Sequence, residues 1–256
     1  MAGMADLTFD PASRELRTRR LLLRPLRDGD APALFEIYRH PAVTQHYDLD
    51  TMDSLEQAQR MLEFFLQHHD RFAVFEADGS TLLGTCGLFH WERASRMVSL
   101  GYDLAPQAWG RGIMREAARA VLAYGFAELK LNRVNALSAV DNPASARLLL
   151  ALGFTEEAVL RQFAWWKGEF HDMRMFALLR DELAALEREG RALHGVRGLR
   201  SARLVHDRQV GDLQQAHRPA PSRSRGFDSP STPKLMRVSE VASSAMHSPG
   251  AKSSTH

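Results

Sequence analysis

Apolar and polar residues along the chain follow two different periods. Segments in which apolar residues recur at every second position predict strands, and segments with an apolar period of about 3.6 predict helices. The strand segments are, in chain order, 20–25, two runs within 71–91, 95–104, 132–140, 155–163 and 170–178. The helix segments are 31–39, 53–69, 112–128, 142–154 and 180–189. This order predicts an α/β fold in which helices cover both faces of a mixed sheet.

Turn and capping residues mark several of these boundaries. Asp30 precedes the first helix and is expected to be its N-cap. Ser54 and Gln57 have the spacing of a capping box at the start of the second helix. Asp78-Gly79 separates the two apolar runs within 71–91 and predicts a hairpin. We therefore expect short connections between most of the elements.

The periodic pattern ends near residue 190, and the charge changes sign there. Residues 1–189 carry 22 Lys and Arg against 27 Asp and Glu, whereas residues 190–256 carry 11 against 4. We expect an N-terminal arm at 1–17, one domain at 18–189 and a basic, disordered tail at 190–256. The tail is either an arm for contact with RNA or a ribosome, or a segment with no selected role. Nucleic-acid binding by the mildly acidic domain itself is not expected.

Several protein classes do not fit this sequence. No apolar run approaches the about 20 residues that a membrane span needs, and the N-terminus lacks the apolar core of a secretory signal. The cytoplasm is therefore the expected location. A single cysteine, Cys86, excludes an internal disulfide and multi-cysteine zinc sites, and its strand-like surroundings predict a small buried side chain. No metal site is expected.

Two glycines, Gly110 and Gly112, stand directly before the helix at 112–128. A glycine-rich segment between a strand and a helix leaves backbone N–H groups unpaired at the positive end of the helix dipole, and this suits a phosphate or diphosphate. A plain flexible start of the helix is the alternative. A dinucleotide-binding fingerprint requires a third glycine where Arg115 stands, and the Gly-Lys-Ser/Thr ending of a P-loop is absent from the chain.

The segment Q-x-x-G-x-G at 107–112 resembles the acyl-CoA-binding signature of the GNAT acetyltransferases. Four segments resemble the RimJ/RimL-type branch, which acetylates N-terminal amines of ribosomal proteins. They are RLLLRPLRDGD, GYDLAPQAWGRGIMREAARAVLAYGF, NPASARLLLALGF and WWKGEFHDMRMFAL. Together they cover about residues 18–185 in the right order. The resemblance implies the GNAT fold, a central, mostly antiparallel mixed sheet with helices on both faces, and acetyl-CoA as cosubstrate.

The resemblance also implies roles for individual residues. The backbone amides expected to hold the CoA diphosphate are those of Gln107, Ala108, Trp109, Gly110, Arg111 and Gly112. Leu104 would pair with the pantetheine arm where the central strand separates from the next one. Asn142 would bind the pantetheine amides, although Asn142-Pro143 is also a typical helix start. Ser145 would protonate the departing thiolate, or be an ordinary residue of the first helical turn.

The sequence departs from the family where a base or an acid is often found. Ser99 and Ala164 occupy the two positions at which relatives have a glutamate, and Leu149 stands where other branches have a tyrosine. Asp103 is the candidate that we single out as a replacement; the pairs His90 with Glu92 and His46 with Tyr47 are further candidates.

An α-amine is about 10% neutral at pH 7, whereas a lysine amine is about 0.04% neutral. A site without a dedicated base therefore favours an α-amine. We expect direct transfer of an acetyl group from acetyl-CoA to a primary amine, with a protein N-terminus as the leading acceptor. A small amine (an antibiotic, a polyamine or an amino-acid derivative) is the alternative, and a catalytically weak acyl-CoA sensor is another. Neighbouring Trp165 and Trp166 must face opposite ways in a strand, so one lines the acceptor groove or forms a homodimer contact.

Overall fold

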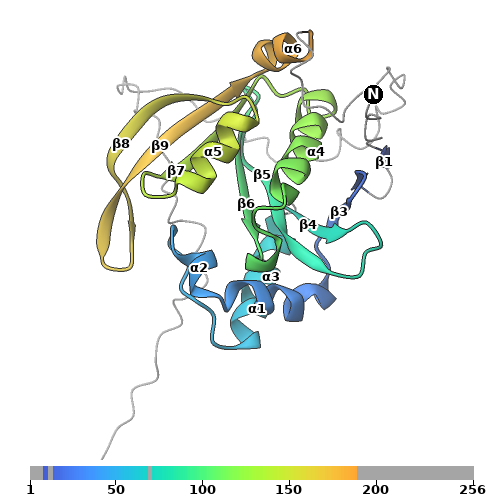
Figure 1. Ribbon diagram of the computed structural model, residues 1–256, viewed down its shortest axis with the longest axis vertical. Coiled ribbons are helices and arrows are strands. Elements are labelled where there is room, and N and C mark those ends of the chain that lie inside the picture. Colours follow the sequence, from blue (N-terminus) through green and yellow to red (C-terminus); the bar gives the residue numbers. More distant parts are fainter. Residues whose placement is uncertain (1–7, 11–13, 69–70, 189–256) are drawn as a thin grey trace, which may run out of the picture. The chain divides into compact units, whose positions relative to one another are not determined.

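The computed structural model describes residues 8–10, 14–68 and 71–188 (Figure 1). The strands are β1 (Thr8–Asp10), β2 (Glu15–Arg17), β3 (Leu21–Pro25), β4 (Arg71–Glu76), β5 (Leu82–Glu92), β6 (Met97–Leu104), β7 (Arg133–Ala139), β8 (Thr155–Trp166) and β9 (Glu169–Leu179). The helices are α1 (Ala31–Tyr38), α2 (Pro41–Thr44), α3 (Leu55–His68), α4 (Ile113–Ala127), α5 (Pro143–Ala151) and α6 (Arg180–Arg188), with 3-10 turns η1 (Asp28–Asp30) and η2 (Pro106–Ala108). No helix among these residues is both long and apolar enough to cross a membrane.

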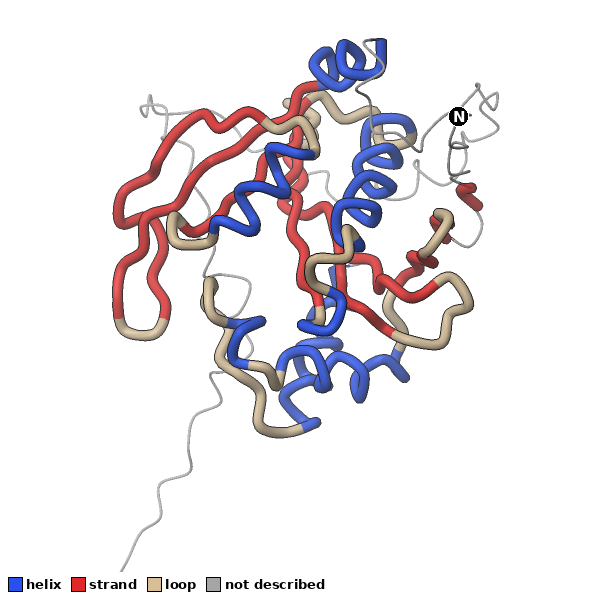
Figure 2. Tube along the Cα trace, viewed as in Figure 1, coloured by secondary structure: helices blue, strands red, loops and turns tan. Residues whose placement is uncertain are grey.

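The strands form a single nine-stranded sheet in the order β1-β2-β3-β4-β5-β6-β7-β9-β8. Every neighbouring pair is antiparallel except β6 and β7, which run parallel. Figure 2 shows the strands in red between helices in blue. The predicted α/β fold with a mixed, mostly antiparallel sheet is confirmed.

Two hydrophobic cores lie on opposite faces of this sheet. In β4, Phe72 and Val74 belong to the core that α4 and α5 cover, whereas Ala73 and Phe75 belong to the core that α1 and α3 cover. This is the alternation that a strand buried on both faces must have. Helices on both faces of the sheet are thereby confirmed, and each core is closed by the apolar side of its helices.

The parallel pair β6 and β7 separates after a short contact. Its register covers only three residues of each strand, from Met97 opposite Arg133 to Ser99 opposite Asn135. β6 continues for five more residues along β5 alone, as far as Leu104. The sheet is therefore open between the carboxyl ends of β6 and β7, and this opening positions the site described below.

Most of the expected elements are present at the expected places, with differences that have local causes. Asp30 does stand at the N-cap position of α1, but it does not cap that helix through its side chain. Its carboxylate accepts two hydrogen bonds from Arg24, at 2.7 and 2.8 Å, and one from the Arg27 amide at 2.8 Å. A buried carboxylate is held more strongly by a guanidinium fork than by helix amides alone.

Some segments were not foreseen from the sequence. The four-residue helix α2 and the three-residue strands β1 and β2 are too short to show a period. Residues 15–17, which we assigned to the N-terminal arm, pair with β3 as strand β2. The predicted tail at 190–256 lies outside the described residues.

Candidate functional site

The glycines before α4 have a left-handed backbone. Gly110 has a φ of +70° and Gly112 a φ of +71°, values that other residues adopt only with strain. A Cβ added to Gly110 would meet no atom within 4 Å. These two glycines therefore let the chain turn into the helix and leave open space against the backbone at Gly110.

Some backbone amides of this segment already have hydrogen-bond partners within the protein. Those of Ala108 and Trp109 donate to the carbonyls of Ala105 and Pro106 within the 3-10 turn. The first backbone bond at the start of α4 runs from the Glu116 amide to the Gly112 carbonyl at 3.2 Å. No described side chain caps this helix. Of the six amides expected to bind a diphosphate, two thus have internal partners, and the uncapped donors continue into the first turn of α4.

An ionic brace holds the loop in place. Arg20 donates from Nη1 to the Arg111 carbonyl at 3.0 Å and from Nε to Glu116 Oε2 at 2.7 Å. Glu116 Oε1 also accepts from the Arg20 amide at 3.1 Å and from the Thr18 hydroxyl at 2.6 Å. The segment before β3 is thereby tied to the loop and to the first turn of α4. Sequence reasoning did not find this brace, because its partners lie far apart in the chain.

Backbone groups of β6 face the opening between β6 and β7. The Ala105 amide donates to Leu83 on the β5 side, and the Arg96 carbonyl accepts from Asn132 on the β7 side. Because a strand alternates, the polar groups of residues 100, 102 and 104 are directed toward the opening. The Leu104 carbonyl accepts from the Trp109 indole at 2.7 Å. The expected pairing of Leu104 with a pantetheine arm stays a prediction, with its amide as the group available.

Tyr102 and Ser145 bring two hydroxyls together at this opening. Their oxygens lie 2.9 Å apart, although the residues belong to β6 and α5. Burial raises the pKa of Tyr102 well above its ordinary value, so the phenol keeps its proton at neutral pH. Tyr102 was not among the candidates from the sequence. The alternation of side chains along a strand places Tyr102 on the opposite face from Asp103, and this pattern in the sequence could have identified it.

Asn142 is the N-cap of α5. Its Oδ1 accepts from the Ser145 amide at 3.1 Å, which fixes the first turn that carries the Ser145 hydroxyl. This is the helix-start role considered above. The capping bond uses only the oxygen of the side chain, so the amide nitrogen remains a donor for the expected contact with pantetheine.

Asp103 lies on the other face of β6 and is held by three donors. Its Oδ2 is 2.8 Å from Arg71 Nη1, 2.8 Å from the Tyr38 hydroxyl and 3.2 Å from the Thr85 hydroxyl. Only 10% of its side chain is exposed. Three donors therefore converge on one oxygen of this carboxylate. The arrangement favours a positioning role for Asp103 over that of a proton acceptor.

The segment between α2 and α3 lies next to the turn of the β8–β9 hairpin (Figure 1). The Lys167 ammonium in that turn donates to the carbonyls of Thr44, at 2.5 Å, and Tyr47, at 3.4 Å. Burial, and then the charge of Asp103, raise the pKa of Tyr47. His46 Nδ1 lies 3.4 Å from Asp141 Oδ1, in the loop between β7 and α5. This segment therefore extends from the face of β6 that carries Asp103 to the loop between β7 and α5.

The remaining candidates are placed as follows. Ala164 and Leu149, where the resemblance led us to look for a base and an acid, are buried. Trp166 is 4% exposed and stacks on His171, whereas Trp165 is 51% exposed and contacts Phe170 edge-on at 4.6 Å. The prediction that the two tryptophans face opposite ways is confirmed.

Cys86 is a buried residue, as expected. Its side chain is 0% exposed, and burial raises the pKa of the thiol to about 12. The thiolate is the reactive form of cysteine, so this environment suppresses nucleophilic chemistry at Cys86.

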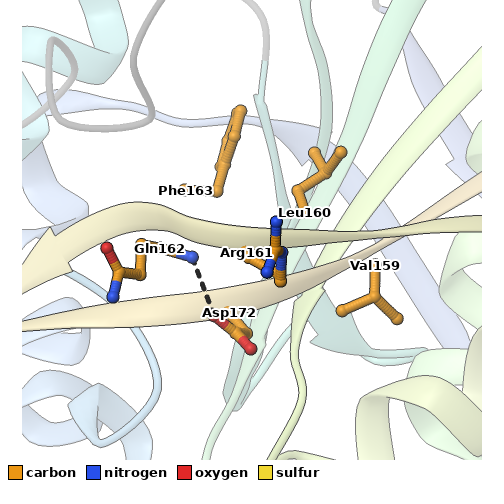
Figure 3. Close-up of a pocket in the computed structure, with 6 residues that line it drawn as sticks. All are labelled: Val159, Leu160, Arg161, Gln162, Phe163 and Asp172. Atoms are coloured by element: carbon orange, nitrogen blue, oxygen red, sulfur yellow. Dashed lines mark hydrogen bonds between the residues drawn. The ribbon is translucent and has the colours of Figure 1, made fainter.

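A hollow on the β8–β9 hairpin lies apart from these groups. Figure 3 shows its lining, which runs from Val159 to Phe163 and includes Asp172. Asp172 Oδ1 accepts from the Gln162 amide at 2.7 Å, where β8 bulges and Gln162 has a φ of +49°. The Asp172 side chain therefore stabilises an irregular strand, and none of the site residues predicted from the sequence lines the hollow.

Comparison with known proteins identifies a family and several relatives of this chain. A family model described as an acetyltransferase (GNAT) domain matches residues 20–155, which is over half of the 256-residue chain. The chain is 35% identical over 170 residues to the uncharacterized N-acetyltransferase YoaA of Bacillus subtilis, covering 64% of this chain and 96% of the relative. It is 26% identical over 176 residues to the ribosomal protein uS5-alanine N-acetyltransferase of Escherichia coli, covering 64% of this chain and 89% of the relative.

A solved structure agrees with the fold. The spermidine N-acetyltransferase of Vibrio cholerae, in complex with CoA and spermine, aligns with a TM-score of 0.57 at 23% identity. The alignment covers 63% of this chain and 96% of that one. With the open β6–β7 pair and the glycine loop before α4, the family match leads to one conclusion: the chain belongs to the GNAT acetyltransferase family.

Proposed function

We propose that the chain transfers an acetyl group from acetyl-CoA directly to a primary amine, with the α-amine of a protein N-terminus as the leading acceptor. The observation that carries this proposal is the opening between β6 and β7, which ends beside the left-handed glycine loop. One end of the opening offers backbone donors for an extended ligand, and the other offers a pair of hydroxyls.

The glycine loop and α4 would hold the diphosphate of acetyl-CoA. The room against the backbone at Gly110 and the lack of a side-chain cap on α4 both fit an anion at this point. Because the amides of Ala108 and Trp109 have internal partners, we assign the binding to the donors from Gly110 onward. Gln107 would contribute through its exposed side chain or its amide.

The Tyr102–Ser145 pair would supply the proton to the departing sulfur. In the transfer step the amine nitrogen forms a bond to the thioester carbonyl carbon and the carbon–sulfur bond breaks, leaving a thiolate. Ser145 would donate its proton to that sulfur and recover one from Tyr102, whose raised pKa keeps it protonated. Asn142 supports this role by fixing the turn that carries Ser145.

The acceptor would approach from the opposite face of β6. Asp103 and Tyr47 lie on that face, and the carboxylate of Asp103 orients Arg71 and Tyr38 around the opening. The amine must enter in its neutral form, and an α-amine is partly neutral at pH 7 whereas a lysine amine is almost wholly protonated. This supports an α-amine as acceptor, in line with the similarity to an enzyme named for ribosomal protein uS5-alanine.

A small cationic amine is a second candidate, because the segment before α3 is acidic. Asp48, Asp50 and Asp53 follow one another closely there, and burial raises the pKa of Asp48. Carboxylates beside an opening attract cations. A solved structure with the same fold holds a polyamine together with CoA, which is the kind of acceptor that such a surface suits.

A thiol-release screen separates these possibilities. The full chain is mixed with acetyl-CoA and, in turn, N-terminal peptides, polyamines, aminoglycosides and amino acids, and free CoA is measured. Fast release with peptides supports the leading proposal, and fast release only with small amines supports the second. Tight binding of acetyl-CoA without release in any mixture would instead identify an acyl-CoA sensor.

A further inference from the structure

The candidate bases in the site described so far are either already engaged by donors or replaced by residues without a carboxylate. Asp103 is held by three donors, and Ser99 and Ala164 offer no carboxylate. An acceptor would have to be a polar atom that is left without a hydrogen-bond partner among the described residues. His46 carries such an atom, because its Nδ1 is buried and has no hydrogen-bond partner among the described residues.

The nearest charged atom to this nitrogen is a carboxylate oxygen. Asp141 Oδ1 lies 3.4 Å from His46 Nδ1, but the geometry falls short of a hydrogen bond. Hydrogen bonds in catalytic sites are often long before the substrate binds and shorten afterwards. A carboxylate in this place favours the imidazole form with its proton on Nδ1, which leaves Nε2 as an acceptor.

The position of Asp141 links His46 to the acid side of the reaction. Asp141 follows the carboxyl end of β7 and directly precedes Asn142, which caps the turn that carries Ser145. Ser145 in turn contacts Tyr102 on β6. A short series of contacts therefore runs from His46 to the hydroxyl pair across the mouth of the β6–β7 opening.

The segment between α2 and α3 has a second anchor besides the contact of His46 with Asp141. Lys167 already binds the carbonyls of Thr44 and Tyr47, on either side of His46. Asp141 is 68% exposed and His46 is 23% exposed, so neither group is locked into a core. Both side chains are therefore partly accessible, as a pair that meets an acceptor must be.

We propose that His46 is the catalytic base of this enzyme and that Asp141 is its positioning residue. The inference rests on the proposed function. As the amine nitrogen bonds to the acetyl carbon, His46 Nε2 takes the proton that the nitrogen must lose. The thiolate receives a proton from the Tyr102–Ser145 pair. Solvent then removes the proton from His46 and restores the one lost by the hydroxyl pair, so charges and atoms balance.

Other ionisable groups lie on the elements packed near this histidine. Lys167 comes from the β8–β9 turn, Asp48 and Tyr47 belong to the same segment as His46, and Asp103 faces Tyr47 from β6. Asp141 is the carboxylate closest to the ring among the described residues. Its replacement therefore changes the ring's environment most directly.

The kinetic test compares His46→Gln and Asp141→Asn with the wild type, using acetyl-CoA with an alanine-first peptide and with spermidine. For His46→Gln we expect kcat to fall at least about 100-fold near pH 7, with an unchanged KM for acetyl-CoA. The loss should narrow as the pH rises, because hydroxide can then take the proton that the attacking nitrogen loses. Asp141→Asn should change kcat in the same direction by a smaller factor. A loss that is the same at every pH would indicate a structural role and overturn the proposal.

His68→Gln is the matched control, since His68 is an exposed histidine at the end of α3. Its pH profile should equal that of the wild type. A second measurement needs no acceptor: nitrogen-15 NMR of the histidine rings in the full chain should show neutral His46 protonated on Nδ1, with a shift toward Nε2 in Asp141→Asn. A wild-type ring protonated on Nε2 would refute the base assignment. Absence of transfer to either amine would refute the proposed function, and the NMR result would still decide the orientation of His46.

Discussion

Tyr102 and Ser145 show how two weak acids become useful only as a pair. A serine hydroxyl alone is a poor proton donor at neutral pH, and a surface tyrosine would form its hydrogen bonds with water. Here the hydroxyls lie 2.9 Å apart at the edge of a buried region, and burial keeps the phenol protonated. The pair can therefore pass a proton toward a group that lies in the opening.

We expect Ser145→Ala to lower kcat by about 10-fold to 100-fold and to leave the KM for acetyl-CoA within about twofold. Tyr102→Phe should lower kcat less. Because the two hydroxyls act in one relay, the double variant should lose little more than Ser145→Ala alone. Steady-state kinetics check all three variants, and a wild-type rate in Ser145→Ala would remove this residue from the mechanism.

Gly110 tests the diphosphate site at a single position. Gly110→Glu adds a carboxylate where the backbone is open and should abolish detectable binding of CoA in a calorimetric titration. Gly79→Glu is the control, since Gly79 also has a positive φ, +76°, but lies in the turn between β4 and β5. Both variants should be destabilised by a similar amount, because both force a side chain into the left-handed region. Retained CoA affinity in Gly110→Glu would show that the site is misplaced.

At the scale of elements, the position of α4 depends on a contact between distant residues, which the hydrophobic periodicity of the sequence does not predict. The Glu116 carboxylate in its first turn accepts from Thr18 and Arg20, which precede β3. Partial burial by itself raises the pKa of Glu116, but these hydrogen bonds and the Arg20 charge outweigh it and lower the pKa below its ordinary value. The brace thus links the turn between β2 and β3 to the loop that would hold the cosubstrate.

A lowered pKa in the folded state means that this contact stabilises the protein above the pKa of the unfolded chain. The stabilisation is lost as the pH falls through the folded-state pKa. Glu116→Gln should lower the free energy of unfolding by about 1 to 2 kcal/mol at neutral pH, and by little at a pH well below the folded-state pKa of Glu116, where the wild-type carboxyl is also protonated.

Urea denaturation at both pH values measures the difference between Glu116→Gln and the wild type. Glu56→Gln is the control, because Glu56 forms an exposed pair with Arg60 on α3 and should change the free energy of unfolding by less than about 0.5 kcal/mol. An equal decrease in the free energy of unfolding for Glu116→Gln at both pH values would mean that the charge of Glu116 does not stabilise the fold.

For the whole molecule, the groups of the proposed site lie between Arg20 and Lys167, and the basic charge lies after residue 190. Deleting residues 196–256 should therefore leave kcat/KM for acetyl transfer and the free energy of unfolding unchanged within error. Kinetics and urea denaturation of the shortened chain check this. Lost activity, or lost association with ribosomes, would show that the tail has a function.

The order of elements could be predicted from the sequence because it depends on local periods. The alternation in β4 and the spacing in α4 reflect which side of each element is buried, and the two periods differ enough to be told apart. The lengths of two strands differ from the prediction. β8 ends at Trp166 and β9 begins at Glu169, so both strands are longer than predicted, because a bulge at Gln162 interrupts the alternation.

What the sequence determined by itself is the family and the place of the glycine loop, since both depend on residues adjacent in the chain. The glycines at 110 and 112 have the backbone angles that only glycine adopts freely, so their presence was already informative. Only the tertiary structure decided which polar groups meet. The partnerships of Tyr102 with Ser145, of Asp103 with Arg71 and of His46 with Asp141 join segments 32 to 95 residues apart. Such pairs depend on how the sheet opens after Ser99, and no local pattern encodes that separation.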